Sequence, residues 1–176
     1  LQIGGANLLD DTERERSAKR PTTSATDIFV QVLATPPTGT VFTASFEAKA
    51  TTDKTAIVNN FFDATGKYAD GKCLYTVTCQ NSTPTRMIDG RAQLSLSTQW
   101  KRYWITWTWS QEMTQPHIHG VIIGEYNSNF ADGTVYIRRI KLEKGTKATD
   151  WCMSDGDINK RIQTQADALT AYQAEV

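Results

Sequence analysis

Apolar and polar residues alternate with a period of two along much of this chain. The clearest case is the segment 41–50, VFTASFEAKA, where every second residue from Phe42 onward is apolar. Successive side chains of a strand point to opposite faces, so the pattern predicts a strand with one buried and one solvated face. The predicted buried face holds Phe42, Ala44, Phe46 and Ala48, and the predicted solvated face holds Thr43, Ser45, Glu47 and Lys49.

Further strand-like segments follow, separated by stretches rich in turn residues such as NSTPTRMIDG and NSNFADG. Short strands between frequent turns, without helical segments between them, are typical of antiparallel sandwiches. We therefore predict an all-β fold, an antiparallel β-sandwich that spans residues 1–153 as one module. The predicted strands cover residues 56–62, 73–79, 92–96, 100–109, 120–125 and 134–143.

The last predicted strand, TVYIRRIKLE at residues 134–143, changes phase in its middle. Its apolar residues follow one parity up to Ile137 and the opposite parity from Ile140 onward. All of these apolar residues can face the core only if the strand contains one more residue than the partner strand opposite it. The sequence therefore predicts a β-bulge near Arg138 and Arg139.

The C-terminal residues 154–176 have a helical pattern. They contain no proline, and Ser154, Asp155 and Asp157 are candidate N-caps. Spacings of four and three residues form the a/d seam of a coiled coil, with one glutamine in it. Two interpretations stay open: the start of a longer oligomeric stalk, which we favour, and a helix packed on its own domain. The seam residues are Ile158, Ile162, Gln165, Leu169, Tyr172 and Val176.

Charge and cysteine content narrow the range of partners. Nineteen basic and nineteen acidic residues balance, which gives no electrostatic reason to expect nucleic acid as a partner. No apolar run approaches the roughly 20 residues that cross a bilayer, so we expect no membrane insertion. Cys73 and Cys79 would lie about 20 Å apart on one strand. That distance is too long for a disulfide, whose Cα atoms lie within about 7 Å, so free thiols are expected.

The segment 100–109, WKRYWITWTW, contains four of the five tryptophans. On a strand, Tyr103, Ile105 and Trp107 share the face that is richer in apolar residues, and we predict that this face is core. Trp104 lies on the other face beside threonines. An outward indole next to hydroxyl groups suits stacking on a sugar ring, although cover by a loop or a neighbouring subunit is the alternative.

Four other residues, Tyr75, Tyr126, Arg86 and Glu47, are candidates for hydrogen bonds to sugar hydroxyls, and each is also compatible with an ordinary surface role. The HIH segment 117–119 is a two-histidine pattern that we interpret as a loop at the start of the following strand rather than as a metal site. The sequence has no GxSxG motif and no phosphate-binding glycine loop. We therefore expect that the protein is not an enzyme.

Two terminal motifs resemble a known family. IGGANLLDDT at residues 3–12 resembles the IGG-x-NLL opening of modules in phage tail fibres, tail-tip proteins and prophage minor structural proteins. DGTVYIRRIKLEKGTKATDW at residues 132–151 resembles the closing strand of those modules, where KLEKG-x-x-ATDW runs into a coiled coil. The interior resembles a jelly roll of the carbohydrate-binding-module type.

The resemblance implies a non-catalytic glycan-binding module, or alternatively a structural spacer with no ligand. It further implies a homotrimer joined through residues 154–176, and a polysaccharide of the bacterial surface as partner. Its expected location is a virion tail or a prophage-encoded particle, made in the bacterial cytoplasm and displayed extracellularly.

The sequence departs from the family at the predicted bulge. Related modules often carry a V-x-I-D-D-V pattern there whose acidic pair helps to bind a structural calcium, whereas this chain has Arg138 and Arg139. Two cations repel a third, so a calcium ion held by this strand is not expected. Asp10, Asp11 and Glu13 remain as other carboxylates for such an ion, and we predict no cofactor.

Overall fold

The computed structural model describes residues 4–19, 26–33, 36–37, 39–52, 54–59, 74–79, 82–88, 91–108, 117–124 and 134–176. Within these ranges the chain forms ten strands and one helix. The elements are β1 (Arg16–Lys19), β2 (Thr26–Val32), β3 (Val41–Ala50), β4 (Lys54–Asn59), β5 (Leu74–Cys79), β6 (Ser82–Ile88), β7 (Arg91–Leu96), β8 (Lys101–Thr108), β9 (His117–Gly124), β10 (Thr134–Lys144) and α1 (Asp155–Ala174).

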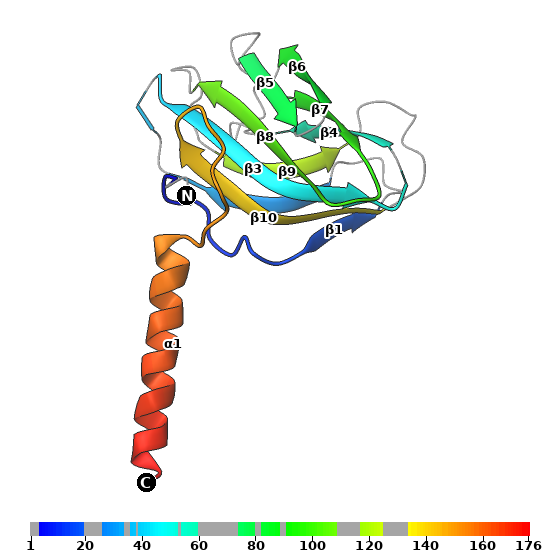
Figure 1. Ribbon diagram of the computed structural model, residues 1–176. Helices are drawn as coiled ribbons and strands as arrows, with labels where there is room; N and C mark the ends of the chain where they lie inside the picture. The colour runs from blue at the N-terminus through cyan, green and yellow to red at the C-terminus, as the bar shows by residue number, and fades with distance from the viewer. Residues whose placement is uncertain are drawn as a thin grey trace.

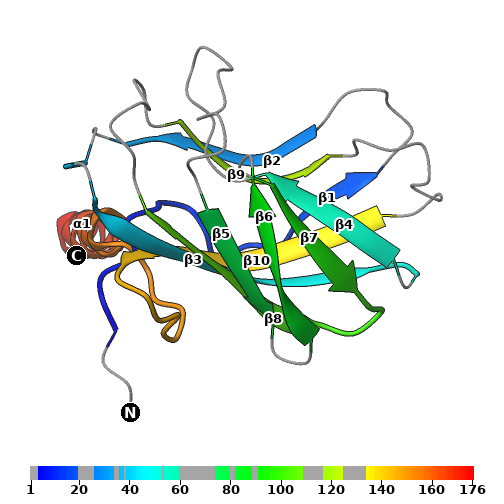
Figure 2. The ribbon, with the colours of Figure 1, turned by 90° about the horizontal axis from the view of Figure 1, so that it is seen from above.

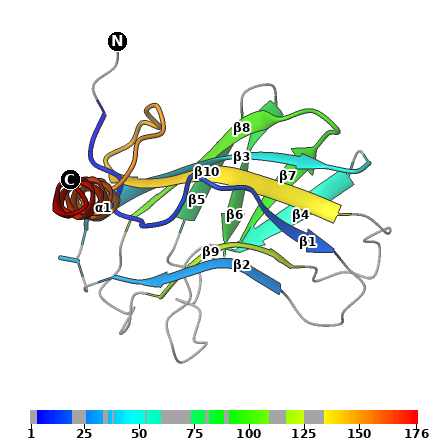
Figure 3. The same ribbon diagram turned by 90° about the horizontal axis from the view of Figure 1, so that it is seen from below.

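The strands form two antiparallel sheets. A six-stranded sheet has the order β1-β10-β3-β8-β5-β6, and a four-stranded sheet has the order β2-β9-β4-β7. Figures 2 and 3 show β2 and β9 in a layer apart from β3 and β10. The predicted antiparallel β body followed by a C-terminal helix is confirmed, and β1, β2 and β6 are strands that the sequence pattern did not predict.

The core lies on the inner face of the six-stranded sheet, where the alternation of β3 predicted it. Tyr103 and Ile105 of β8 are completely buried, as expected, and the Tyr103 ring stacks on Phe46 at a centroid distance of 5.9 Å. The side chain of Trp107 lies outside the described residues. Other buried apolar residues on these strands are Phe42, Ala44, Ala48, Ala50, Val135, Ile137, Ile140 and Leu142.

The outer face of β3 is not uniformly solvated. Thr43 and Ser45 are fully buried, so the prediction that they face solvent is wrong. The chain after β10 returns over this part of the sheet: Thr43 Oγ1 donates to the carbonyl oxygen of Gly145 at 2.7 Å. A second layer of main chain therefore covers hydroxyl groups that local alternation assigns to water.

The predicted β-bulge is present. The pairing of β10 with β3 shifts register between Arg138 and Lys141, and Arg139 has φ +51°. Ile137 and Ile140 are both buried despite their opposite parity, which is what the extra residue permits.

Helix α1 projects away from the β body (Figure 1). None of its residues is buried, so the interpretation that it packs on its own domain is wrong. No helix in the described part of the chain has the length and apolar content that a membrane span requires.

Candidate functional site: the junction between the β body and the helix

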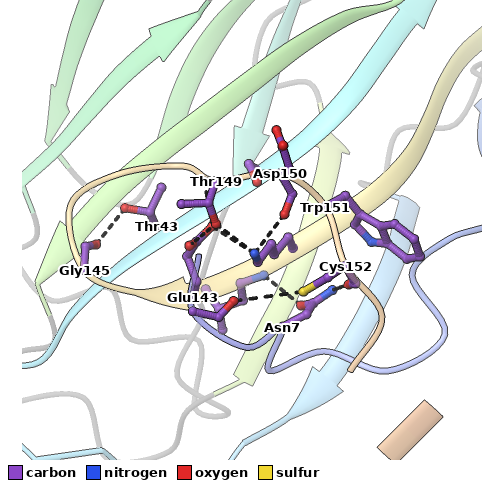
Figure 4. Close-up of polar contacts among 12 residues, drawn as sticks. Asn7, Thr43, Glu143, Gly145, Thr149, Asp150, Trp151 and Cys152 are labelled. Carbon is purple, nitrogen blue, oxygen red and sulfur yellow. Dashed lines mark hydrogen bonds and ion pairs between the residues drawn. The ribbon is translucent and has the colours of Figure 1, made fainter. Parts of the chain in front are cut away.

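A buried ion pair holds the chain that leads from β10 to the helix. Lys141 and Glu143 lie two residues apart on β10, and their side chains are 1% and 2% exposed. Their charged groups are 3.7 Å apart, and Thr149 bridges them. Lys141 Nζ donates to Thr149 Oγ1 at 2.8 Å, and that hydroxyl donates to Glu143 Oε1 at 2.6 Å (Figure 4). Two further bonds complete the cluster, from Lys141 Nζ to Asp150 O and from Thr149 N to Glu143 Oε2.

Gly145 makes the turn that brings Thr149 back over the sheet. Its φ of +112° is a conformation that favours glycine, and its N–H donates to Val41 O at 2.9 Å. These constraints explain the glycine of the KLEKG motif.

Arg102 of β8 closes the other side of this turn. Its guanidinium donates to Ser45 Oγ at 2.7 Å and to Thr149 O at 2.6 Å. Burial lowers the pKa of Arg102 from its ordinary value, while the carboxylates of Glu47, Asp150 and Glu143 raise it in part. An arginine stays protonated in proteins, so its charge supports the cluster at all working pH values.

Asn7 of the NLL motif is the hub of the N-terminal side. Its side chain is buried, and the donors and acceptors of its amide are all used. These bonds join the N-terminal segment to β10 and to the chain before the helix. The amide nitrogen lies within 3.1 Å of Thr12 Oγ1, Ile140 O and Cys152 O, and the amide oxygen accepts from the N–H groups of Leu9 and Leu142.

The two terminal motifs interlock here. A Cβ atom on Gly4 would lie 1.8 Å from Thr149 Oγ1, so the first glycine of the IGG motif is required by close approach. Trp151 of the ATDW segment donates from Nε1 to Thr12 Oγ1 at 3.1 Å. The residues that carry the resemblance thus build a joint, which we call the junction: Gly4, Asn7, Thr12, Lys141, Glu143, Gly145, Thr149 and Trp151.

The helix begins at the junction. Ser154 is buried, and its Oγ accepts from Asp157 N at 3.0 Å, which confirms it as the N-cap. The same hydroxyl donates to Asp10 Oδ1 at 2.6 Å. Asp11 N donates to Asp157 Oδ2 at 2.7 Å. The first turn of α1 is therefore bonded to the N-terminal segment, which fixes the direction of the helix.

The carboxylates considered for calcium have other partners. Asp10 accepts a hydrogen bond from the hydroxyl of the N-cap residue Ser154. Asp11 forms ion pairs with Arg14 at 3.2 Å and with Arg16 at 3.1 Å. Burial and the nearby Arg14 lower the pKa of Arg16, whereas Asp11 raises it. In the described residues no group of three or more His, Cys, Asp or Glu side chains could hold a metal.

Replacing Ser154 with alanine is expected to lower the free energy of unfolding by about 1 kcal/mol, since an N-cap hydroxyl typically contributes that amount. Thermal unfolding followed by circular dichroism measures the change. Ser17→Ala removes the same atom from an exposed position of β1 and should change stability by less than about 0.5 kcal/mol. Equal stability of the two variants would contradict a capping role for Ser154.

The structure places two of the predicted sugar contacts on one face. Trp104 is half-buried on β8, opposite Ser45 of β3, and Glu47 lies two residues from Ser45 on the same strand. The carboxylate of Glu47 already forms ion pairs with Arg138 and Arg139. Tyr75 lies in β5 and Arg86 in β6, but the structure does not describe their side chains. The same holds for the side chains of His117 and His119 in β9. Tyr126 lies outside the described residues. The sugar-contact predictions remain predictions.

Sequence reasoning missed a group of residues beside Glu47. Lys49 Nζ lies 4.9 Å from the ring centroid of Trp100 and 5.4 Å from that of Tyr136. Arg138 Cζ lies 4.1 Å from the Trp100 centroid. Alternation placed Glu47 and Lys49 on one face, but no local signal linked them to β10 or to Trp100, the residue before β8. We call this set the cation–aromatic patch: Glu47, Lys49, Trp100, Tyr136, Arg138 and Arg139.

Comparisons with known proteins give little further information. No protein-family model matches the chain, and no curated protein matches it. One solved structure, described as "CBM4 structure and function", is similar over 79% of this chain and 68% of that chain, with 14% identity and a TM-score of 0.38. A likeness at this level supports no assignment of ligand or activity.

Proposed function

We propose that the protein is a non-catalytic glycan-binding module of a phage or prophage tail fibre, carried on a homotrimeric coiled-coil stem that starts in α1. One observation carries this proposal: α1 exposes its whole a/d seam, while its first turn is bonded to the β body through a buried junction. A helix held rigidly at one end and unpartnered along its apolar stripe is suited to join copies of the module.

The seam favours self-association. Ile158, Ile162, Leu169, Tyr172 and Val176 are 42%, 58%, 57%, 66% and 95% exposed. Burial of such side chains in a bundle is favourable, by about 25 cal/mol per Å² of apolar surface. Ile158 and Ile162 occupy successive d and a positions, and isoleucine at both positions shifts coiled coils from dimers toward trimers.

The strand order supports a jelly roll. When β5 and β6 are left aside, the chain alternates between two sets of four strands, β1-β10-β3-β8 of one sheet and β2-β9-β4-β7 of the other. Two four-stranded sheets connected in this order form the double-layered jelly roll found in lectin domains. The fold alone fixes no function, so the binding role depends on the surface it presents.

The outer face supports carbohydrate binding. Trp100, Trp104 and Tyr136 are half-exposed there, next to charged and hydroxyl-bearing residues. Aromatic rings beside hydrogen-bonding groups are the components of a sugar site. Weak single sites would be multiplied by avidity on a trimeric stem. The partner is a polysaccharide of a bacterial surface, and the module is displayed extracellularly on the tail.

The test is a glycan array probed with the full chain, followed by titration with bacterial wall polysaccharides. We expect binding without release of reducing sugar ends. Absence of binding to any glycan would contradict the proposal, and release of sugars would contradict its non-catalytic part.

A structural spacer is the second candidate, because the junction orients the stem whether or not the body has a ligand. Trp104→Ala separates the two functions. In a glycan-binding module it weakens adsorption by up to about tenfold with little change in assembly, since aromatic stacking contributes about 0.5 to 1.5 kcal/mol. In a spacer it alters only stability or subunit association. Glycan titration and sedimentation of the same samples measure both.

A further inference from the structure

The cation–aromatic patch lies on the outer face of the six-stranded sheet, beside the part that the returning chain covers. Tyr136 of β10 is paired with Lys49 of β3, and Arg138 is paired with Glu47. Arg139 is 49% exposed at its side chain, and the other members are half-buried. The patch is therefore a solvent-accessible surface built from β3, β10 and Trp100, the residue before β8.

The β-bulge brings two consecutive arginines to this surface. In a regular strand Arg138 and Arg139 would point to opposite faces. Instead both contact Glu47, with Arg138 Nε at 2.5 Å from Oε2 and Arg139 Nη1 at 3.4 Å from Oε1. The cost is a positive φ at Arg139, which glycine would adopt without strain. Backbone strain of this kind accumulates at functional sites.

Positive charge on the patch exceeds negative charge. Three cations, Lys49, Arg138 and Arg139, surround one carboxylate, and both oxygens of Glu47 are used. Lys49 makes contacts with two aromatic rings and no hydrogen bond or ion pair with any described residue. Cation–π contacts hold an ammonium group in place but leave its N–H donors free. Arg139 likewise uses one of its five N–H donors in its contacts with the described residues.

We infer that the cation–aromatic patch binds an acidic sugar, through a carboxylate on the pyranose ring. A guanidinium fork matches the two oxygens of a carboxylate. Within the chain, Arg138 already donates from Nε to one carboxylate oxygen of Glu47. In this inference, the remaining N–H donors of Lys49 and Arg139 bind the carboxylate of the ligand. The exposed parts of Trp100 and Tyr136 contact the C–H face of the sugar ring. The inference rests on the proposed glycan-binding function and names its class of ligand.

A matched pair of probes tests the charge requirement. The full chain is titrated by calorimetry with a short oligogalacturonate and with the same oligosaccharide as its methyl ester, which lacks the negative charges. We expect the acid to bind at least about tenfold more tightly, because hydrogen bonds to charged groups are stronger than those between neutral groups. The difference should shrink as salt is added.

Two variants test the location. Lys49→Gln and Arg139→Gly are each expected to weaken oligogalacturonate binding about tenfold. Arg139→Gly should melt at the same or a higher temperature than the wild type, since glycine relieves the positive φ, so weaker binding would not reflect unfolding. Lys147→Gln removes one charge from an exposed residue outside the patch and should bind like the wild type.

The results separate this inference from the proposed function. Equal affinity for acid and ester, or patch variants that bind like the wild type, would overturn the patch assignment while leaving glycan binding intact. If the chain binds neutral glycans of the array but neither oligosaccharide, the patch assignment is also overturned and glycan binding stands. Failure with every glycan would overturn both.

Discussion

Replacing Glu143 with alanine is expected to lower the free energy of unfolding by about 3 to 5 kcal/mol, the range for removing one partner of a buried ion pair. The ammonium group of Lys141 is 1% exposed at its side chain and would lose its only carboxylate within 4 Å among the described residues. Thr149 would lose the acceptor for both its hydroxyl and its N–H. Urea unfolding measures the change as a shift of the midpoint at constant slope.

Two controls separate charge from packing. Lys144→Ala removes an exposed charge next to Glu143 and should change stability by less than about 0.5 kcal/mol. Lys141→Met combined with Glu143→Leu should recover most of the loss, because apolar pairs of similar volume replace buried ion pairs at little cost. A Glu143→Ala cost below about 1 kcal/mol would show that the pair does not stabilise the junction.

Introducing Asp at both Ile162 and Leu169 is expected to abolish self-association of the chain. Each replacement removes an apolar side chain whose burial is worth about 2 kcal/mol per subunit. It also places carboxylates of neighbouring chains in one layer of the seam, where like charges repel. Sedimentation equilibrium at high protein concentration should show the wild type associating toward trimers and the variant as a monomer.

A matched control uses the opposite side of the helix. Thr164 lies outside the a/d seam, and its hydroxyl donates to Lys160 O within the same helix. Thr164→Asp should therefore associate like the wild type. If the seam variant and the wild type have the same mass distribution, the seam does not form the subunit contact.

Much of the secondary structure could be predicted because its signals are local. The alternation in VFTASFEAKA locates β3 and its core face, and the parity change between Ile137 and Ile140 locates the bulge. Ser154 marks the first turn of α1. Each of these signals depends on side-chain direction or on backbone hydrogen bonds within a few residues. Such short-range features can be predicted from the residue types in a short segment.

The candidate sites could not be predicted in the same way. Lys141 and Glu143 alternate with apolar residues, and such polar positions are normally solvated. They are buried because Thr149 returns over them and Asn7 joins the far end of the chain to the same strand. The neighbours of Lys49 in the patch likewise come from β10 and from Trp100, the residue before β8, and the pairing of distant strands places them there.

By itself, the sequence determined seven of the ten strands of the described residues, where one strand bulges, where the helix begins and which of its residues form an apolar stripe. The tertiary structure decided that the helix stands free of the body, that the terminal motifs form its junction, and that cations gather around Trp100. The physical reason is that periodicity records only the face of an element that avoids water. Which distant segment covers the other face depends on contacts that form only when the whole chain is folded.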